Sequence, residues 1–464
     1  MKSILRTFSE RRTLARTGGW LAVCLWLAVA WPGHAQTAYS LQQAIDYAVQ
    51  NNNSVKNAQL DIVNANARIG ETRAIGLPQI SGQAQLVHNI KIQQVILENG
   101  AGPFGDANLP IGSVIAFPFQ LKNLGGVTLN VNQLLFSGSY FVGLQAARTY
   151  RQLSEKGLAS SKITVVENVT KAYYGVLVNR ERLGLLQANV ERLEKLVNET
   201  REFNRNGLVE KIDVDRLEVQ YNNLKAEAQN VERLVQLSES LLKFQMNAPL
   251  NEPIALTEKL TDLTNTSFAT VTETAFDYNR RIEYSLLQEQ RELNLLDARN
   301  IRAARLPTLG AAFTTGYNPA ASRLENITQS ARWINYSFVA LQLNVPIFGG
   351  LSSRYQMQQK RVAVQKTEND IAQFKRAADL QVQQSNTTLQ NAMESMKTQQ
   401  RNLDLANEVV RVTRIKYQQG VGSNIEVVNA EGSLREAQTN YYAALYDALI
   451  AKVDLNKATG ELYK

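Results

Sequence analysis

The feature that most constrains the fold is that the chain carries two copies of one sequence pattern. Four short segments recur in the same order in both halves, at 44–47 and 275–278, 77–78 and 306–307, 136–138 and 348–350, and 207–214 and 420–427. Such repetition indicates two structurally equivalent units. We therefore expect a first repeat at 36–248, a linker or equatorial segment at 249–271, and a second repeat at 272–464.

Each repeat is expected to contain a helix, a strand, a loop, a second strand, a very long helix, a tight turn and a last helix. The long helices are expected at 139–206 and 351–419, each about 70 residues and about 100 Å long. The shorter helices of the first repeat, 41–75 and 208–247, together match that length. We expect each pair of short helices to stack end to end along its long helix.

Heptad spacing supports this helical reading. Apolar residues recur every seven positions at Leu41, Ala48, Val55, Ile62 and Ile69. The same spacing, with one step of eleven after Ala378, gives Met357, Val364, Ile371, Ala378, Leu389, Met396, Leu403, Val410 and Tyr417. Seven-residue spacing is typical of coiled coils, and an inserted four residues relaxes the supercoil locally. The long helices are therefore expected to pack as coiled coils.

Four segments alternate apolar and amide-bearing residues with a period of two, which predicts strands near 78–92, 127–136, 308–317 and 334–346. Alternation of this kind over about ten residues is typical of transmembrane β-barrels. The residues expected to face lipid are Ile80, Leu86, Val127, Leu129, Val131, Leu341 and Leu343. In the last strand the apolar positions shift from even (Ile334, Tyr336 and Phe338) to odd, which predicts a bulge or an interfacial aromatic belt there.

Four strands cannot close a barrel, and an open sheet edge in lipid would leave backbone groups without partners. The chain must therefore oligomerise, and three copies would supply twelve strands with room for a lumen. The fold class expected is mainly α with a transmembrane β part, in which a trimeric twelve-stranded barrel continues into a periplasmic coiled-coil tube. The loops at 93–126 and 318–332 then lie on the exterior.

The first 35 residues have the features of a cleaved signal peptide. A basic segment precedes the apolar run Trp20 to Trp31, and small residues follow at Gly33 and Ala35. The single cysteine, Cys24, lies inside that run, so the mature chain has no disulfides. Beyond the signal no basic stretch is interleaved with aromatic residues, which argues against a nucleic-acid partner.

The whole mature chain resembles the TolC-like outer-membrane efflux protein family. The resemblance rests on the duplicated unit and on the strand-ending turns Phe136-Ser137-Gly138 and Phe348-Gly349-Gly350. It implies a homotrimeric exit duct in the cell outer membrane, in contact with outer-membrane lipid and with its helices in the periplasm. It also implies a tripartite efflux or type I secretion system, with a periplasmic adaptor (membrane fusion) protein and an inner-membrane pump. The turns at Gly207 and Gly420 would be the tips that the adaptor grips.

The tips also carry the residues expected to form an entrance. Asp213 and Glu426 each lie six residues past a tip glycine, where the helix macrodipole alone favours an acid. Threefold symmetry would alternatively gather these carboxylates into a ring that attracts cations. The family can also line the entrance with an acid three residues further on, a position held here by Asn429. Tyr417 either reaches Asp213 across neighbouring hairpins and latches the mouth, or packs in its heptad stripe.

The sequence contains few of the histidine and cysteine residues that enzymes use for catalysis. The mature chain has one histidine, His88, no cysteine and no phosphate-binding loop, so we expect neither catalysis nor a cofactor or metal. Two other classes of exported helical protein, a periplasmic adaptor and a coiled-coil scaffold, do not require the four amphipathic strands. The sequence therefore favours a passive duct, and leaves its transported compounds and its particular pump open.

Overall fold

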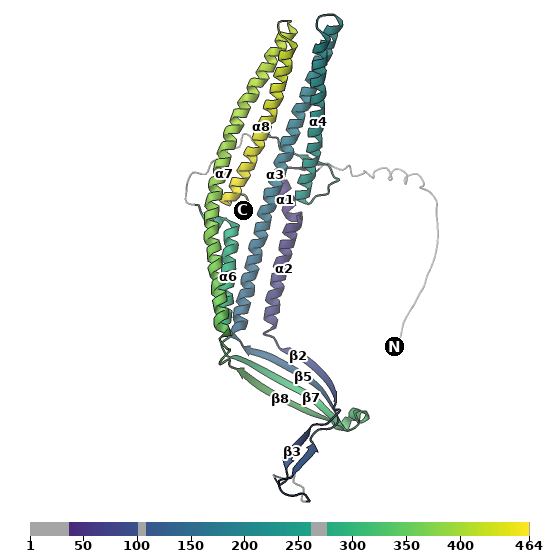
Figure 1. Ribbon diagram of the computed structural model, residues 1–464, viewed down its shortest axis with the longest axis vertical. Coiled ribbons are helices and arrows are strands. Elements are labelled where there is room, and N and C mark those ends of the chain that lie inside the picture. Colours follow the sequence, from purple (N-terminus) through teal and green to yellow (C-terminus); the bar gives the residue numbers. More distant parts are fainter. Residues whose placement is uncertain (1–36, 101–107, 261–275, 464) are drawn as a thin grey trace, which may run out of the picture.

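The computed structural model describes residues 37–100, 108–260 and 276–463. Within them the chain forms a long helical rod that joins a four-stranded sheet, with a separate strand hairpin beyond the sheet (Figure 1). The expected signal peptide lies outside the described residues, as do residues 261–271 of the expected linker. None of the helices in the described ranges is long and apolar enough to cross a membrane.

The helices of the described residues follow the expected order. The α-helices are α1 (Leu41–Asn51), α2 (Asn53–Ala74), α3 (Gly138–Arg205), α4 (Lys211–Met246), α6 (Ile282–Ala303), α7 (Ser352–Gln418) and α8 (Asn424–Thr459). Three short 3-10 helices are η1 (Tyr278–Arg280), η2 (Leu324–Thr328) and η3 (Ser330–Arg332). The two long helices, α3 and α7, confirm their expected bounds to within one residue at each end.

The helix expected at 41–75 is in fact two helices, because Asn52 interrupts it. Asn52 has an extended backbone (φ −62°, ψ 133°), and its Oδ1 accepts a hydrogen bond of 2.8 Å from the backbone N–H of Ser54. A short amide side chain competes with the helix for backbone partners in this way. Ala48 and Val55 on either side of the break are both buried. The heptad pattern therefore continues across the break and does not reveal it.

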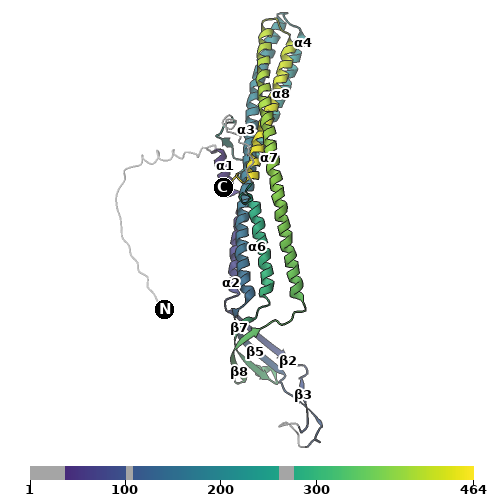
Figure 2. The same cartoon turned by 90° about the vertical axis from the view of Figure 1, so that its left-hand side faces the viewer.

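End-to-end stacking is confirmed in both repeats. The helix α4 ends where α1 meets α2, and Asn247 Nδ2 donates to the Asn51 carbonyl across the joint at 3.0 Å. In the second repeat Arg281 Nη1, just before α6, donates to the carbonyl of Ala458 near the end of α8 at 3.0 Å. Figure 2 shows α6 and α8 one above the other beside the continuous α7. The rod is therefore built from two long helices, each flanked by a broken partner.

The core of the rod is a set of narrow seams between helices. The predicted α7 stripe is buried at Met357, Ala378, Leu389, Leu403, Val410 and Tyr417 and partly buried at Val364, Ile371 and Met396. The largest cluster lies halfway along the rod, where Tyr173 of α3, Leu242 of α4 and Leu445 of α8 are buried together. The heptad prediction, including its step of eleven residues, is confirmed.

The main sheet has the strand order β2-β5-β7-β8, and every pair of neighbours is antiparallel. Its strands are β2 (Gln79–His88), β5 (Asn123–Phe136), β7 (Thr308–Ala321) and β8 (Trp333–Asn344). A parallel pair, β1 (Thr37–Tyr39) and β6 (Ile254–Leu256), joins the start of the described chain to the expected linker. Within the chain β2 and β8 are the two edges of the main sheet, and both are long.

Two expectations for the strands were wrong. The stretch 93–126, expected as a loop, contains the antiparallel hairpin of β3 (Gln94–Glu98) and β4 (Val114–Pro118). The strand β2 ends at His88, short of the expected residue 92. One further backbone bond, from the Asn89 N–H to the Lys122 carbonyl at 2.7 Å, follows the end of β2. The chain then leaves the sheet to form the hairpin.

Of the two alternatives expected for the last strand, the bulge is absent, because β8 pairs with β7 without a shift from Trp333 to Asn344. The interfacial aromatic belt stays a prediction. The irregularity lies in β5 instead, between Leu134 and Phe136. Tyr336 simply points to the polar side of the sheet, where its hydroxyl lies 3.1 Å from Thr128 Oγ1. The partner of the Tyr336 hydroxyl lies in β5, two strands away from β8. The pattern of residues within one strand does not predict such a contact.

Alanine in place of Gly316 is expected to loosen this sheet. A Cβ at Gly316 would lie 2.5 Å from the Val127 carbonyl oxygen, so β5 and β7 would have to move apart. We expect a loss of about 1 to 3 kcal/mol, as for other overpacked sites, measured as a lower melting temperature in detergent. Gly310→Ala is the matched control, because its Cβ would meet the Gln133 carbonyl at an ordinary 3.7 Å. Equal melting temperatures for the two variants would contradict this account.

Candidate entrance at the hairpin tips and candidate membrane face

The two hairpin tips have the left-handed glycines that the sequence predicts. Gly207 and Gly420 each have a φ of 72°. This left-handed conformation is energetically unfavourable for residues that have a side chain. The Leu208 N–H donates to the Phe203 carbonyl at 2.9 Å, and the Val421 N–H to the Lys416 carbonyl at 3.0 Å. These bonds close the ends of α3 and α7. Both tips lie at the end of the rod that is remote from the sheet (Figure 1).

The candidate entrance acids lie in the first turns of the returning helices. Asp213 belongs to the first turn of α4, and its Oδ1 lies 3.7 Å from Arg216 Nη1. Glu426 belongs to the first turn of α8 and is exposed, as is Asn429 one turn later. Negative charge at a helix N-terminus is favourable by itself. Within one chain these residues lie on two separate hairpins.

Asn424 links the two tips and was not among the predicted site residues. It is 4% exposed, and its Nδ2 donates to the Asp213 carbonyl at 2.7 Å. Its Oδ1 has no hydrogen-bond partner among the described residues. The matching position in the first repeat is Lys211. The two repeats therefore differ in residue type at this position, which is the sequence feature that could have pointed to Asn424. The contact ties the start of α8 to the start of α4.

Tyr417 packs between the hairpins. It is 9% exposed, and it belongs with Val427 to an apolar cluster made mostly by α3 and α4. Its hydroxyl lies 3.2 Å from Thr200 Oγ1 of α3, whereas the latch alternative has Asp213 as its partner. The heptad alternative is therefore the one realised within the chain. Tyr417 nevertheless joins the second hairpin to the first near their tips.

A polar cluster lies further from the tips, between α3 and α8. Asn189 is buried and donates from Nδ2 to Gln438 Oε1 at 2.6 Å, while Arg192 donates to Asn189 Oδ1. Burial raises the pKa of the nearby Glu431 carboxyl despite the opposing charges of Arg192 and Arg414. Amides inside a heptad seam were not singled out in the sequence, although Asn189 interrupts the apolar run of α3. The cluster joins α3 of the first hairpin to α8 of the second.

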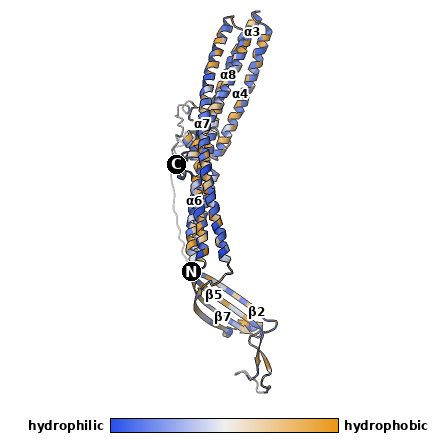
Figure 3. Cartoon of the chain, turned by 60° about the vertical axis from the view of Figure 1, so that its left-hand side comes forward, coloured by the Kyte–Doolittle hydropathy of each residue, from blue (hydrophilic) through white to orange (hydrophobic). Residues whose placement is uncertain are grey.

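The register places all seven expected lipid-facing residues on one face of the sheet. Ile80 pairs with Val131, Val127 pairs with Tyr317, and directly paired residues of antiparallel strands point to the same side. Continuing through β7, Leu341 pairs with Ala311 and Leu343 with Leu309 on that side. Hydrophobic and hydrophilic residues alternate along these strands in Figure 3. The opposite face carries the amides and hydroxyls, among them the Thr314 Oγ1 to Asn130 Oδ1 bond of 2.9 Å.

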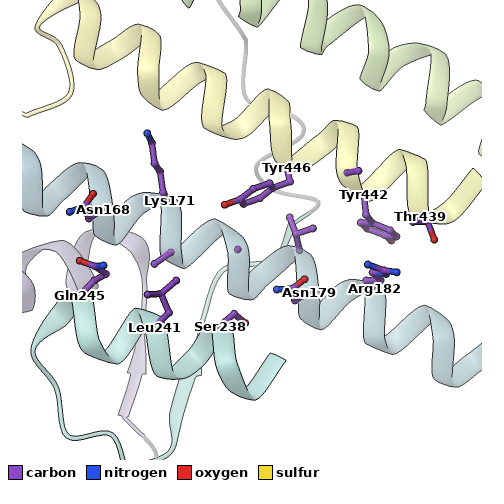
Figure 4. A pocket seen from close by; sticks show the side chains of 14 residues that line it. Asn168, Lys171, Asn179, Arg182, Ser238, Leu241, Gln245, Thr439, Tyr442 and Tyr446 are labelled. Atoms are coloured by element: carbon purple, nitrogen blue, oxygen red, sulfur yellow. The ribbon is translucent and has the colours of Figure 1, made fainter. Parts of the chain in front are cut away.

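A hollow of about 530 Å³ lies between α3, α4 and α8, halfway along the rod (Figure 4). Its walls carry Lys171 and Arg182 beside amides and the rings of Tyr442 and Tyr446. Lys171 Nζ pairs with Glu167 at 2.9 Å and with Asp454 at 2.5 Å. Burial raises the pKa of Glu167, but hydrogen bonds from Lys171 and Lys457 outweigh it and leave that pKa lowered. These ion pairs join α3 to α8. The hollow is therefore lined by side chains that hold the helices of the rod together.

The described residues contain no group of three or more histidine, cysteine, aspartate or glutamate side chains placed to hold a metal ion. His88 has a structural partner, since its Nδ1 lies 2.7 Å from Asn123 Oδ1. The Asn123 amide nitrogen donates to the carbonyls of Ala321 and Ser322, so its oxygen faces the histidine as an acceptor. Nδ1 is therefore the protonated ring nitrogen. His88 and Asn123 together join the end of β2 to the start of β5 and the end of β7.

Comparison with known proteins agrees with this geometry. A family model described as outer membrane efflux protein matches residues 288–461. Over 343 residues the chain is 26% identical to the alkaline protease secretion protein AprF of Pseudomonas aeruginosa, a match covering 72% of this chain and 69% of AprF. Over 350 residues it is 23% identical to the outer membrane protein TolC of Vibrio cholerae, covering 72% of this chain and 76% of that protein.

Solved structures share the fold. The open state of the MtrE outer membrane channel of Neisseria gonorrhoeae matches with a TM-score of 0.69 at 18% sequence identity. The match covers 92% of this chain and 90% of that channel. The rod, the sheet and their order along the chain therefore occur together in a known outer-membrane channel.

Proposed function

The chain belongs to the TolC-like outer-membrane efflux protein family, and from that premise we propose that it is an outer-membrane exit duct of a tripartite efflux or type I secretion system. Substrates would pass from a periplasmic adaptor and an inner-membrane pump to the exterior. The proposal rests on one observation. A single chain contains both a sheet that has one apolar face and a long helical rod. The sheet suits a bilayer and the rod suits the aqueous periplasm. Outer-membrane channels of this family are not enzymes.

A trimer is the assembly we propose. The edges β2 and β8 each have one neighbour within the chain, and unpaired strand edges are costly in lipid. Pairing β2 of one copy with β8 of the next satisfies both edges, and three copies close a twelve-stranded barrel with a lumen. The face with Leu129 and Leu341 would then meet lipid, while the face with Asn130 would line the lumen.

The adaptor is proposed to bind at the tips. Gly207 and Gly420 lie at the remote end of the rod, where a protein reaching from the inner membrane would first meet the duct. Leu208 and Val421 next to them are exposed apolar residues, which provide a contact surface. Asp213, Glu426 and Asn429 would then line the entrance just inside this contact.

Mass measurement and conductance test the proposed function together. The purified protein in detergent is expected to have three times the protomer mass and, in a planar bilayer, to form ion-conducting pores. A water-soluble monomer with no pore activity would overturn the proposal. Co-purification from membranes would identify the adaptor and the pump.

Glutamine in place of Glu426 is expected to reduce cation selectivity. If threefold symmetry brings three exposed carboxylates together at the mouth, the ring attracts cations, and neutralising it removes that field. The reversal potential in a salt gradient measures the selectivity. Glu408→Gln is the matched control, because Glu408 is also exposed on the second hairpin but is paired with Arg411 at 2.6 Å. Unchanged selectivity for Glu426→Gln would return this residue to the role of a helix-end charge.

A further inference from the structure

Four arginines line one hollow where the rod meets the sheet. Arg302 and Arg305 come from the end of α6 and the turn after it, and Arg354 and Arg361 come from the start of α7. The hollow has a volume of about 770 Å³, and all four residues are exposed.

These guanidinium groups have no ion-pair or hydrogen-bond partner among the described residues, unlike their basic neighbours. Lys360 pairs with Asp297 at 2.6 Å, and Arg299 lies 3.9 Å from Glu292. Four like charges without a counter-charge repel one another, so the hollow favours an anion.

The same hollow has an apolar rim on the side of the sheet. The connection from β8 to α7 passes along it with Ile347 94% exposed and Phe348 80% exposed. Leu351 at the start of α7 is also exposed. Apolar side chains beside a basic cluster, at the end of a strand with an apolar face, match the boundary between acyl chains and phosphate headgroups.

The first repeat shows that the fold does not need this cluster. Aligning the two Leu-Pro pairs matches Arg302 with Arg73 but Arg305 with Gly76. The first ten residues of α3 contain no charged residue, whereas those of α7 include Arg354, Lys360 and Arg361. The cluster of four arginines is therefore peculiar to the second repeat.

In the proposed trimer, the helix of a neighbouring copy nearest to this hollow carries no net negative charge. The helix beside the β2 edge is α2, which in the proposed trimer would approach the β8 edge of the next copy. Its charged residues are the basic Lys56, Arg68 and Arg73 and the acidic Asp61 and Glu71. The helix has one more basic than acidic residue, so its net charge does not offset the four arginines.

We propose that this hollow binds the headgroup of an anionic phospholipid in the leaflet that faces the helical rod. The arginines contact the phosphate oxygens, and Ile347 and Phe348 enter the acyl region. The inference rests on the proposed function, because it requires the sheet to lie in the membrane.

Native mass spectrometry of the trimer released from mixed lipid tests the inference. The vesicles contain phosphatidylcholine and phosphatidylglycerol in equal amounts, and the retained lipids are counted for each trimer. Wild type is expected to retain phosphatidylglycerol preferentially. The triple variant Arg305→Gln, Arg354→Gln, Arg361→Gln is expected to lose that preference by about tenfold, because each basic residue near an anionic surface adds to the attraction.

The control variant is Arg73→Gln with Arg148→Gln, which removes basic residues at the same level of the first repeat. It is expected to keep the wild-type preference. Equal retention of the two lipids by wild type, or equal loss in the control, would overturn the inference.

The same spectra separate this inference from the proposed function. A trimer that shows no lipid preference overturns the lipid site alone, whereas the absence of a trimer overturns the proposed function. A triple variant that dissociates in pure phosphatidylcholine would make the cluster an interface between copies, which also overturns the inference.

Discussion

Arginine in place of Leu129 is expected to block most insertion into the outer membrane. Leu129 lies in the middle of β5, on the face that carries Ile80, Val131 and Leu341. A charged side chain on the lipid face near the bilayer midplane costs ~2 to 4 kcal/mol for each copy, and a trimer would carry three. The amount of heat-resistant trimer in outer-membrane fractions measures the effect.

Asn130→Arg is the matched control, one residue further along the same strand. Its side chain lies on the opposite face, where Asn130 Oδ1 accepts a hydrogen bond from Thr314. We expect normal insertion and a changed single-channel conductance, because the new charge would enter the lumen. Equal insertion defects in both variants would show that the sheet does not separate lipid from lumen as proposed.

Alanine in place of Tyr417 is expected to open the tips. The ring is buried against the cluster that α3 and α4 form, and its removal leaves a cavity between the two hairpins. Truncation of a buried aromatic residue costs about 3 to 5 kcal/mol, which is large for so thin a seam. The helices should then separate more often, and the basal conductance in a planar bilayer should rise.

The variants Tyr417→Phe and Thr200→Val calibrate that result. Each removes only the hydroxyl contact of 3.2 Å between these residues, a loss of about 0.5 to 1.5 kcal/mol. A small and similar rise in conductance is expected for both. If Tyr417→Ala leaves the conductance at the wild-type value, the closed state is held elsewhere along the rod.

Local patterns predicted the elements well where they repeat over many residues. The stripe from Met357 to Tyr417 is long enough to define α7 to within a residue, and alternation places Leu129 and Asn130 on opposite faces. The same patterns did not predict the effects of single residues. Asn52 breaks a helix without disturbing the heptad, since the buried residues on both sides of it keep their spacing.

The hairpin of β3 and β4 was missed because its two short strands are separated by a long connection and lack a tight-turn motif. Contacts between distant segments were missed for a different reason. The Asn424 contact with Asp213, and the pairing of Tyr417 with Thr200, join residues more than two hundred positions apart. No periodicity within one element carries information about such partners.

The sequence by itself determined the duplication, the coiled-coil seams, the left-handed glycines at the tips and the two faces of each strand, because each follows from the chemistry of a local segment. Only the tertiary structure decided which residues meet: the order β2-β5-β7-β8, the polar contacts between the hairpins, and the gathering of four unpaired arginines at the junction. The physical reason is that a helix or strand has a periodicity of its own. The partner that covers each face is chosen by the packing of the whole chain.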